Sequence, residues 1–201
     1  MPKNKGRRID LTVQLTMKNV LMSISLAIFA SVSSVLAQSQ EINPTLQAKI
    51  DGQLKLVQEW GKDPVIVKAT KEHNANLPAD KAAMTQEKWK TLSVLDPFIR
   101  ALTKNEAALF LKSKKTETFG EAFLSGADGL KVCFLSKTTN WSHKGKPKHD
   151  VPMTGKTWQG PIEVDESTGL QQVQVSAPVL DGDKPIGSLV VGLVVSKLGK
   201  D

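Results

Sequence analysis

A cluster of cationic side chains is the most distinctive candidate for chemistry in this chain. The polar stretch between Ser136 and Gln159 carries five lysines and two histidines: Lys137, His143, Lys144, Lys146, Lys148, His149 and Lys156. Cations that converge over a pocket bind a carboxylate or another anion. The alternative is a solvated charged loop, because most lysines in folded proteins are exposed. The sequence leaves both interpretations open.

Two tryptophans, Trp141 and Trp158, bracket this basic stretch. Aromatic rings near the mouth of a pocket supply apolar walls for a small ligand. Equally, the two rings could anchor the loop on the body of the domain. Further along the chain, three polar residues at alternate positions either line the same pocket or face water: Gln172, Gln174 and Ser176.

The sequence gives little support to a metal site or to an enzyme. His143 and His149 are six residues apart with Asp150 adjacent, which is not a recognised ligand spacing, so incidental polar residues are favoured. Cys133 is the only cysteine, which excludes an internal disulfide, and we expect it to be a buried small hydrophobe. No nucleophile elbow, phosphate loop or zinc-protease helix is present, so we expect no catalytic residue and no cofactor.

Helical periodicity fills the first half of the mature chain. Apolar residues recur at helical spacing over residues 43–60, with Asn43 as the expected N-cap and Pro44 at the first helical position. Shorter helices are predicted to begin at three further points: Asp63-Pro64, Thr85 and Asp96-Pro97. A capping box at Thr103–Glu106 predicts the start of a helix that runs to about Lys114.

The pattern then changes to that of strands joined by turns. Five strands are predicted, over 121–125, 130–136, 161–164, 170–180 and 185–195. The fourth alternates apolar and polar residues, and the fifth is apolar on both faces, as expected of a central strand. Helices followed by antiparallel hairpins indicate an α+β domain, in which a long N-terminal helix and short helices pack on a five-stranded sheet.

The N-terminus has the features of an export signal. Lys18 precedes an uncharged apolar stretch over residues 20–30, and small residues end at Ala37. This pattern predicts a signal peptide over residues 1–37, cleaved after Ala37, followed by a single periplasmic domain over residues 38–201. A start at Met17 would leave a signal of ordinary length. The alternative is a retained membrane anchor, because the stretch is nearly long enough to span a bilayer.

The charge balance does not favour a nucleic-acid partner. The formal net charge is +7, but five of the 27 Lys and Arg residues and one of the 20 Asp and Glu residues precede Gln38. The remainder has 22 against 19, a net charge of +3. Nucleic-acid binding usually needs a strongly basic face, so we expect no nucleic-acid partner.

Several short motifs, in this order and spacing, resemble the periplasmic PDC-type Cache sensor domain of bacteria, which has a PAS-like fold. The resemblance covers about residues 42–198 and is carried by five pieces: Trp60 with Asp63–Ile66, Asp128–Leu130, Ser136–Trp141, Val164–Ser167 and the final hairpin. It implies a PAS-like sheet backed by the N-terminal helix, with a small-ligand pocket between the sheet and the loops above it. In relatives the segment after the Ser-Lys-Thr-Thr stretch is aromatic and then acidic, whereas residues 140–149 are basic here.

This resemblance also implies a function. A free-standing exported member would capture a small organic acid or amino acid and pass a signal to a membrane-bound partner, without being an enzyme. The alternative is a structural or interaction protein that kept the fold without a working pocket. Long N-terminal helices in such modules often pair, so a weak homodimer is a further expectation.

The resemblance suggests where the ligand would lie. An acidic residue at Asp165 or Glu166 would hold an amino group, although both residue types also favour turns. The expected ligand-binding residues are Phe134, Ser136, Trp141, Lys156, Trp158, Asp165 and Gln174.

Overall fold

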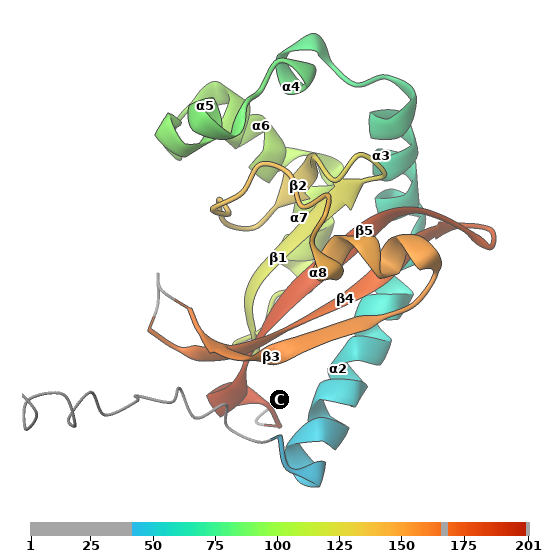
Figure 1. The fold of residues 1–201 in the computed structure, drawn as a ribbon, viewed down its shortest axis with the longest axis vertical. Helices are drawn as coiled ribbons and strands as arrows, with labels where there is room; N and C mark the ends of the chain where they lie inside the picture. Colours follow the sequence, from blue (N-terminus) through green and yellow to red (C-terminus); the bar gives the residue numbers. More distant parts are fainter. Residues whose placement is uncertain (1–41, 166–168, 200–201) are drawn as a thin grey trace, which may run out of the picture. The chain divides into compact units, whose positions relative to one another are not determined.

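Six helices precede the first strand in the part of the chain that the structure describes (Figure 1). The structure is a computed structural model, and it describes residues 42–165 and 169–199. The helices are α2 (Pro44–Gly61), α3 (Pro64–Ala75), α4 (Ala79–Ala82), α5 (Gln86–Thr91), α6 (Pro97–Lys104) and α7 (Glu106–Ser113). The predicted signal peptide and its cleavage site lie outside the described residues.

Side-chain caps start most of these helices where the sequence predicted them. Asn43 accepts a hydrogen bond from the Leu46 amide at 2.9 Å, and three other predicted caps act in the same way: Asp63, Thr85 and Asp96. The predicted capping box at Thr103–Glu106 is wrong. Thr103 lies inside α6, which continues to Lys104, and Asn105 caps α7 instead. Asn105 is the residue between the two helices with an extended backbone, which is the conformation that an N-cap needs.

All five strands join one antiparallel sheet in the order β2-β1-β5-β4-β3, which confirms the α+β class. The strands are β1 (Phe119–Gly126), β2 (Lys131–Phe134), β3 (Trp158–Val164), β4 (Gln171–Asp181) and β5 (Lys184–Val194), after which a short 3-10 helix, η2, covers Val195–Lys197. The central strand is β5, the one whose sequence is apolar on both faces.

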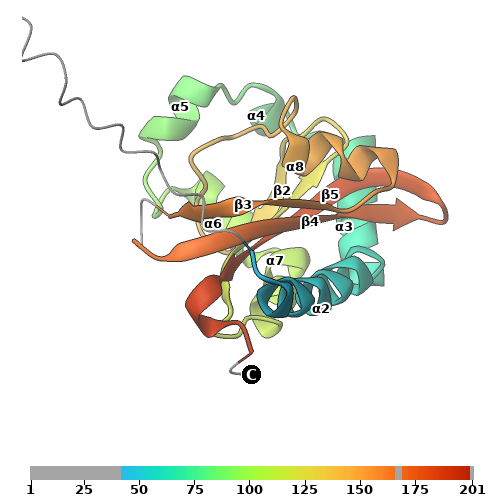
Figure 2. The ribbon, with the colours of Figure 1, turned by 60° about the horizontal axis from the view of Figure 1, so that its bottom comes forward.

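The two faces of the sheet are covered differently. Figure 2 shows α2 and α7 on one side of the sheet and α5 and α8 on the other. On the α2 side, the alternate apolar residues of β4 pack with Ile50 and Val57 in the larger core cluster: Val173, Val175 and Ala177. A smaller cluster on the opposite side contains the aromatic residues Trp89, Phe123, Phe134 and Trp141. The alternation predicted for β4 is thereby confirmed.

The segment between β2 and β3 is more ordered than the long polar loop that the sequence predicted. It contains a helical turn, α8 (Pro147–Asp150), and a 3-10 turn, η1 (Pro152–Thr154). Prolines open both turns, and the side chains of Trp141, His143 and His149 are buried against the sheet. Among the helices that the structure describes, none combines the length and the apolar character needed to cross a membrane.

Candidate functional site

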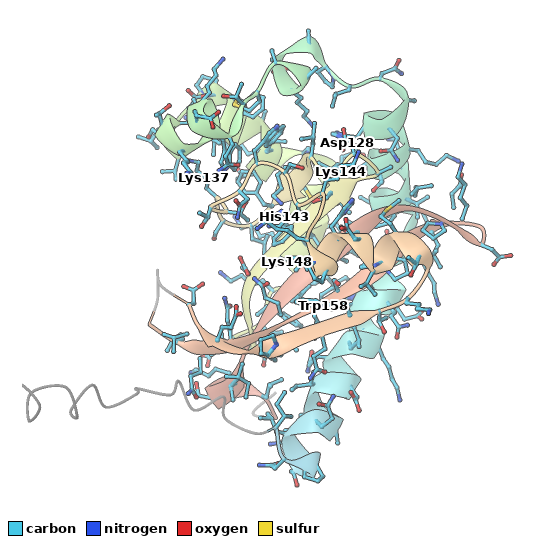
Figure 3. All side chains as sticks on the ribbon, in the orientation of Figure 1. Asp128, Lys137, His143, Lys144, Lys148 and Trp158 are labelled. Carbon is cyan, nitrogen blue, oxygen red and sulfur yellow. The ribbon has the colours of Figure 1, made fainter. Side chains whose placement is uncertain are left out.

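A cleft of about 590 Å³ opens on the sheet face opposite α2. Its floor comes from β1 and β4, and its walls come from the segment after β2, from α8 and from the end of β3. The polar and charged lining residues are Glu121, Ser136, Lys137, Thr138, Thr139, Asn140, His143, Lys148, Glu163, Asp165, Gln172 and Gln174. In the view of Figure 3 the labelled Lys148 lies between His143 and Trp158.

Hydrogen bonds between side chains order the floor of the cleft. Lys148 Nζ donates to Gln174 Oε1, and Gln174 Nε2 donates to Glu121 Oε1. Beside them, Gln172 Nε2 donates to Asp165 Oδ2 at 3.0 Å. The two glutamine amides therefore hold the Lys148 ammonium and the carboxylates of Glu121 and Asp165 in place. Gln172 and Gln174 line the cleft, whereas Ser176 on the same strand face is fully buried.

One wall of the cleft rests on a buried lysine. The Lys131 side chain on β2 is fully buried, and its Nζ hydrogen-bonds His143 Nδ1. The same ammonium lies 3.8 Å from the centroid of the Phe123 ring, and the His143 ring stacks on Phe123 with centroids 4.6 Å apart. Phe123 and His143 both line the cleft, so Lys131 supports its wall from behind.

Burial of this pair disfavours charge on both members. Desolvation lowers the pKa of the Lys131 amine well below its ordinary value, although the nearby Glu121 carboxylate acts in the opposite direction. Desolvation, reinforced by the Lys131 charge, lowers the pKa of His143 to about 2. At neutral pH His143 is therefore a neutral imidazole beside Lys131.

Local backbone geometry decides where His143 lies. Its amide donates to the Gly129 carbonyl at 2.9 Å, and Ser142 forms an isolated bridge with Leu130. Gly129 has a φ of +80°, and a Cβ there would lie 2.5 Å from the backbone nitrogen of Lys144. Only glycine satisfies both constraints, so this turn fixes the segment that carries His143.

The charges of the cleft come from different elements. Lys148 on α8 is half-buried, and desolvation lowers its pKa. Carboxylates come from β1 at Glu121 and from the end of β3 at Glu163 and Asp165. Lys137 at the rim is already engaged, because its ammonium donates to the Leu92 carbonyl at 2.8 Å. One cleft thus offers a partly desolvated ammonium together with several carboxylates.

Three of the residues predicted from the sequence to bind ligand line this cleft: Ser136, Asp165 and Gln174. Phe134 and Trp141 are buried in the aromatic cluster with Trp89, where the Trp89 and Trp141 centroids are 5.1 Å apart. Trp141 therefore anchors the segment on the body of the domain. Lys156 is exposed and Trp158 is half-buried with its indole against Gly160, and neither lines the cleft.

The expected hollow beneath the basic segment is filled by side chains, and the cleft opens beside it. Sequence reasoning did not single out Lys131 or Glu121. The available signal for Lys131 was a lysine inside the apolar strand sequence Leu130–Leu135. Glu121 carried no such signal, since a charged residue near a strand end is common.

The remaining chemistry-bearing residues have structural partners. His149 is buried, with Nδ1 at 2.8 Å from Ser188 Oγ, and His73 Nε2 lies 3.1 Å from both oxygens of Asp128. Burial raises the pKa of the Cys133 thiol to about 12, so it stays protonated inside the core. Within residues 42–165 and 169–199, no three His, Cys, Asp or Glu side chains group so as to hold a metal ion.

No protein-family model matches the chain, and no curated protein matches it in sequence. Among solved structures, the sensor domain of the V. cholerae histidine kinase DctB is 13% identical, with a TM-score of 0.46 over 78% of this chain and 54% of that one. The ligand binding domain of the Pseudomonas aeruginosa PAO1 amino acid chemoreceptor PctC, in complex with GABA, is 13% identical, with a TM-score of 0.42 over 90% and 63%.

The ligand-binding domain of the Pseudomonas fluorescens chemoreceptor CtaA, in complex with L-serine, is 12% identical, with a TM-score of 0.40 over 92% of this chain and 62% of that one. The chain spans between about half and two thirds of the length of these three structures. Each of these three structures is a sensor or ligand-binding domain.

Proposed function

We propose that this chain is a small-ligand-binding sensor module that holds a small organic acid or amino acid in the cleft between β1, β4 and α8. The observation that carries the proposal is the pairing, in one cleft, of the Lys148 ammonium with the carboxylates of Glu121, Glu163 and Asp165. Desolvated charges recognise ligand charges of opposite sign more strongly than exposed ones do.

The spacing of these charges favours a ligand that carries both signs. An anionic group would lie at Lys148, whose partly desolvated ammonium has further hydrogen-bond donors beside the one that Gln174 accepts. A cationic group would lie toward Glu163 and Asp165 at the end of β3. Phe123 would supply an apolar wall between the two poles. A monocarboxylic acid would use only the first pole and bind more weakly.

A ligand signals only if it binds two conformations of the protein with different affinities. The cleft is formed by separate parts of the chain: α8 on one side and the end of β3 on the other. A ligand that bridges Lys148 and Asp165 would draw these parts together. We propose that a membrane-bound partner reads this change, and that the protein works outside the cytoplasm after export by its N-terminal signal.

A thermal-shift screen against organic acids, amines and amino acids tests the proposal. A ligand at 100 times its Kd adds about 2.7 kcal/mol, which raises the Tm of a domain of this size by roughly 5–10 °C. Lys148→Met should weaken binding of an amphoteric hit at least tenfold, and Asp165→Asn should weaken its amino-group recognition. Lys156→Met is the matched control, because Lys156 is exposed and does not line the cleft.

The outcomes are distinct. A hit whose affinity depends on Lys148 and Asp165, but not on Lys156, supports the module and its site. A hit that all three variants bind equally well would show that the ligand lies elsewhere. The absence of any hit from a broad panel would count against the sensor role itself.

A second candidate is an interaction protein that kept the fold without a ligand pocket. The filled space beneath the segment favours it, because Phe134, Trp141 and Trp89 occupy the position expected for the pocket. This role predicts a membrane partner that co-purifies in the absence of small molecules. Partner binding that is insensitive to Lys148→Met, together with an empty ligand screen, would favour it over the sensor.

A further inference from the structure

The segment Trp141–Thr154 is held on the sheet by two imidazoles that point inward. His143 is 3% exposed and bonds Lys131 on β2, and His149 is 1% exposed and bonds Ser188 on β5. The His149 ring also hydrogen-bonds the backbone of Ala127. Two imidazoles therefore make inward polar contacts for this segment, beside the bond from Lys148 to Gln174.

The charges around these imidazoles are of both signs. Among the described residues, no carboxylate forms an ion pair with Lys131. The titratable groups that face the two imidazoles are Glu121 on β1, Asp128 in the β1–β2 turn, Lys131 and Cys133 on β2, and Lys146, Lys148 and Asp150 in the segment. Glu121 already accepts from Gln174, so its charge is shared with the floor of the cleft.

The protonation state of His143 decides whether its contact with Lys131 can form. A Lys131 ammonium donates to the lone pair on His143 Nδ1, so this contact needs a neutral imidazole. A proton on Nδ1 removes the acceptor and places two cations face to face, without solvent between them. A proton on His149 would leave its contacts intact, because the Ser188 hydroxyl and the Ala127 carbonyl can both accept a hydrogen bond. Protonation of His143, by contrast, is accommodated only if the segment leaves the sheet.

We propose that the segment Trp141–Thr154 is an acid-released flap: the contact of His143 with Lys131 holds the cleft in its binding shape and breaks when His143 takes up a proton. His143 and Lys148 both belong to the flap and both line the cleft. Release would therefore remove one wall and the ammonium pole together. This regulation of ligand binding rests on the proposed function, whereas the release itself does not.

Hydrogen exchange of the ligand-free protein between pH 7.5 and pH 5.0 tests the release. After correction for intrinsic exchange rates, the opening constant of peptides covering 141–154 should rise about tenfold per pH unit below about pH 6.5, through the proton that His143 takes up. Peptides of β4 and β5 should have smaller opening constants than those of the segment at every pH. His143→Gln keeps an acceptor for Lys131, and its opening constant should depend on one proton fewer than that of the parent chain. Lys144→Gln changes an exposed residue in the same segment and should leave the pH dependence of the opening constant unaltered.

Several results would overturn the flap. A pH-independent opening constant would do so, and so would opening constants in β4 and β5 equal to those of 141–154, which would mean global unfolding. If His143→Gln does not fold, the pH dependence measured on the parent chain still decides between these outcomes. The ligand screen is a separate readout at fixed pH: acid release supports the flap even if no ligand is found. A hit that binds equally well at pH 7.5 and pH 5.5, despite release, would overturn the regulatory role.

Discussion

Trp89 donates its indole N–H to the carbonyl oxygen of Thr138 at 2.8 Å, and this bond ties helix α5 to the segment that leaves β2. The Trp89 ring is fully buried and meets Phe134 edge-on, with centroids 5.7 Å apart. Gln86, on the same helix, accepts from the Trp141 amide at 2.9 Å. A six-residue helix that would be unstable alone is thus fixed by tertiary contacts, and it fixes one rim of the cleft in return.

Trp89→Phe should destabilise the domain by about 1–3 kcal/mol, because the Thr138 carbonyl loses its donor while most of the ring burial is kept. Urea unfolding followed by circular dichroism measures the loss. Trp60→Phe is the control, since Trp60 is half-buried and packs edge-on against Phe119 on the other side of the sheet. If Trp89→Phe lowers the free energy of unfolding no more than Trp60→Phe does, the hydrogen bond to the Thr138 carbonyl does not contribute as argued.

Stability should fall as acid is added below about pH 6.5. The unfolded chain protonates His143 near its ordinary pKa, whereas burial lowers the pKa of the folded form to about 2. The folded state therefore binds fewer protons in this window, and its free energy of unfolding drops by about 1.4 kcal/mol per pH unit. Between pH 6.5 and pH 5 the loss from this residue is about 2 kcal/mol.

Denaturation of His143→Gln at the same pH values isolates this contribution. The free energy of unfolding of the variant should depend on about one proton fewer, so its plot against pH should be flatter than that of the parent chain. His149, whose pKa burial also lowers, accounts for part of the remaining slope. Parallel curves for variant and parent would show that His143 titrates normally in the folded state.

Gly129→Ala should cost about 2–4 kcal/mol, combining a left-handed backbone with a clash against the backbone of Lys144. Gly145→Ala is a matched control, because Gly145 has a φ of +82° but no atom within 4 Å of the added methyl. That change should cost only about 1 kcal/mol. Chemical denaturation of both variants separates the cost of backbone strain from the cost of the clash. Equal losses in the free energy of unfolding would show that the clash contributes nothing.

Asn105→Ala should destabilise the domain by about 1–2 kcal/mol, whereas Thr103→Ala should be nearly neutral. Asn105 accepts from the Ala108 amide and donates to the Val132 carbonyl, both at 2.9 Å, so it caps α7 and joins that helix to β2. The Thr103 hydroxyl donates only to the Arg100 carbonyl on the exposed side of α6. Thermal unfolding of the two variants decides between the caps, and a larger loss for Thr103→Ala would favour the capping box.

Local sequence signals were sufficient for most element boundaries. Asn43-Pro44, Asp63-Pro64 and Asp96-Pro97 each start a helix, because the cap and the proline act within one turn of chain. The alternation of β4 likewise requires only that one face be buried. The capping box failed because Thr103 and Asn105 both suit an N-cap, and the length of α6 decided between them.

The composition of the cleft could not be predicted in the same way. Glu121, Lys148 and Gln174 come from a strand, a helical turn and another strand, and their contacts depend on the strand order and on how the segment folds back. Phe134 and Trp141 were expected at a pocket because apolar aromatic residues suit pocket walls and cores equally. Their burial with Trp89 was decided by the position of α5.

By itself, the sequence determined the succession of helices and hairpins, the central place of β5 and the resemblance to sensor domains, because these depend on periodicity and on caps that act over a few residues. Only the tertiary structure placed Lys131 behind His143 and brought Lys148 beside Glu121. Contacts between residues distant along the chain depend on which strands become neighbours, and no local pattern encodes that choice.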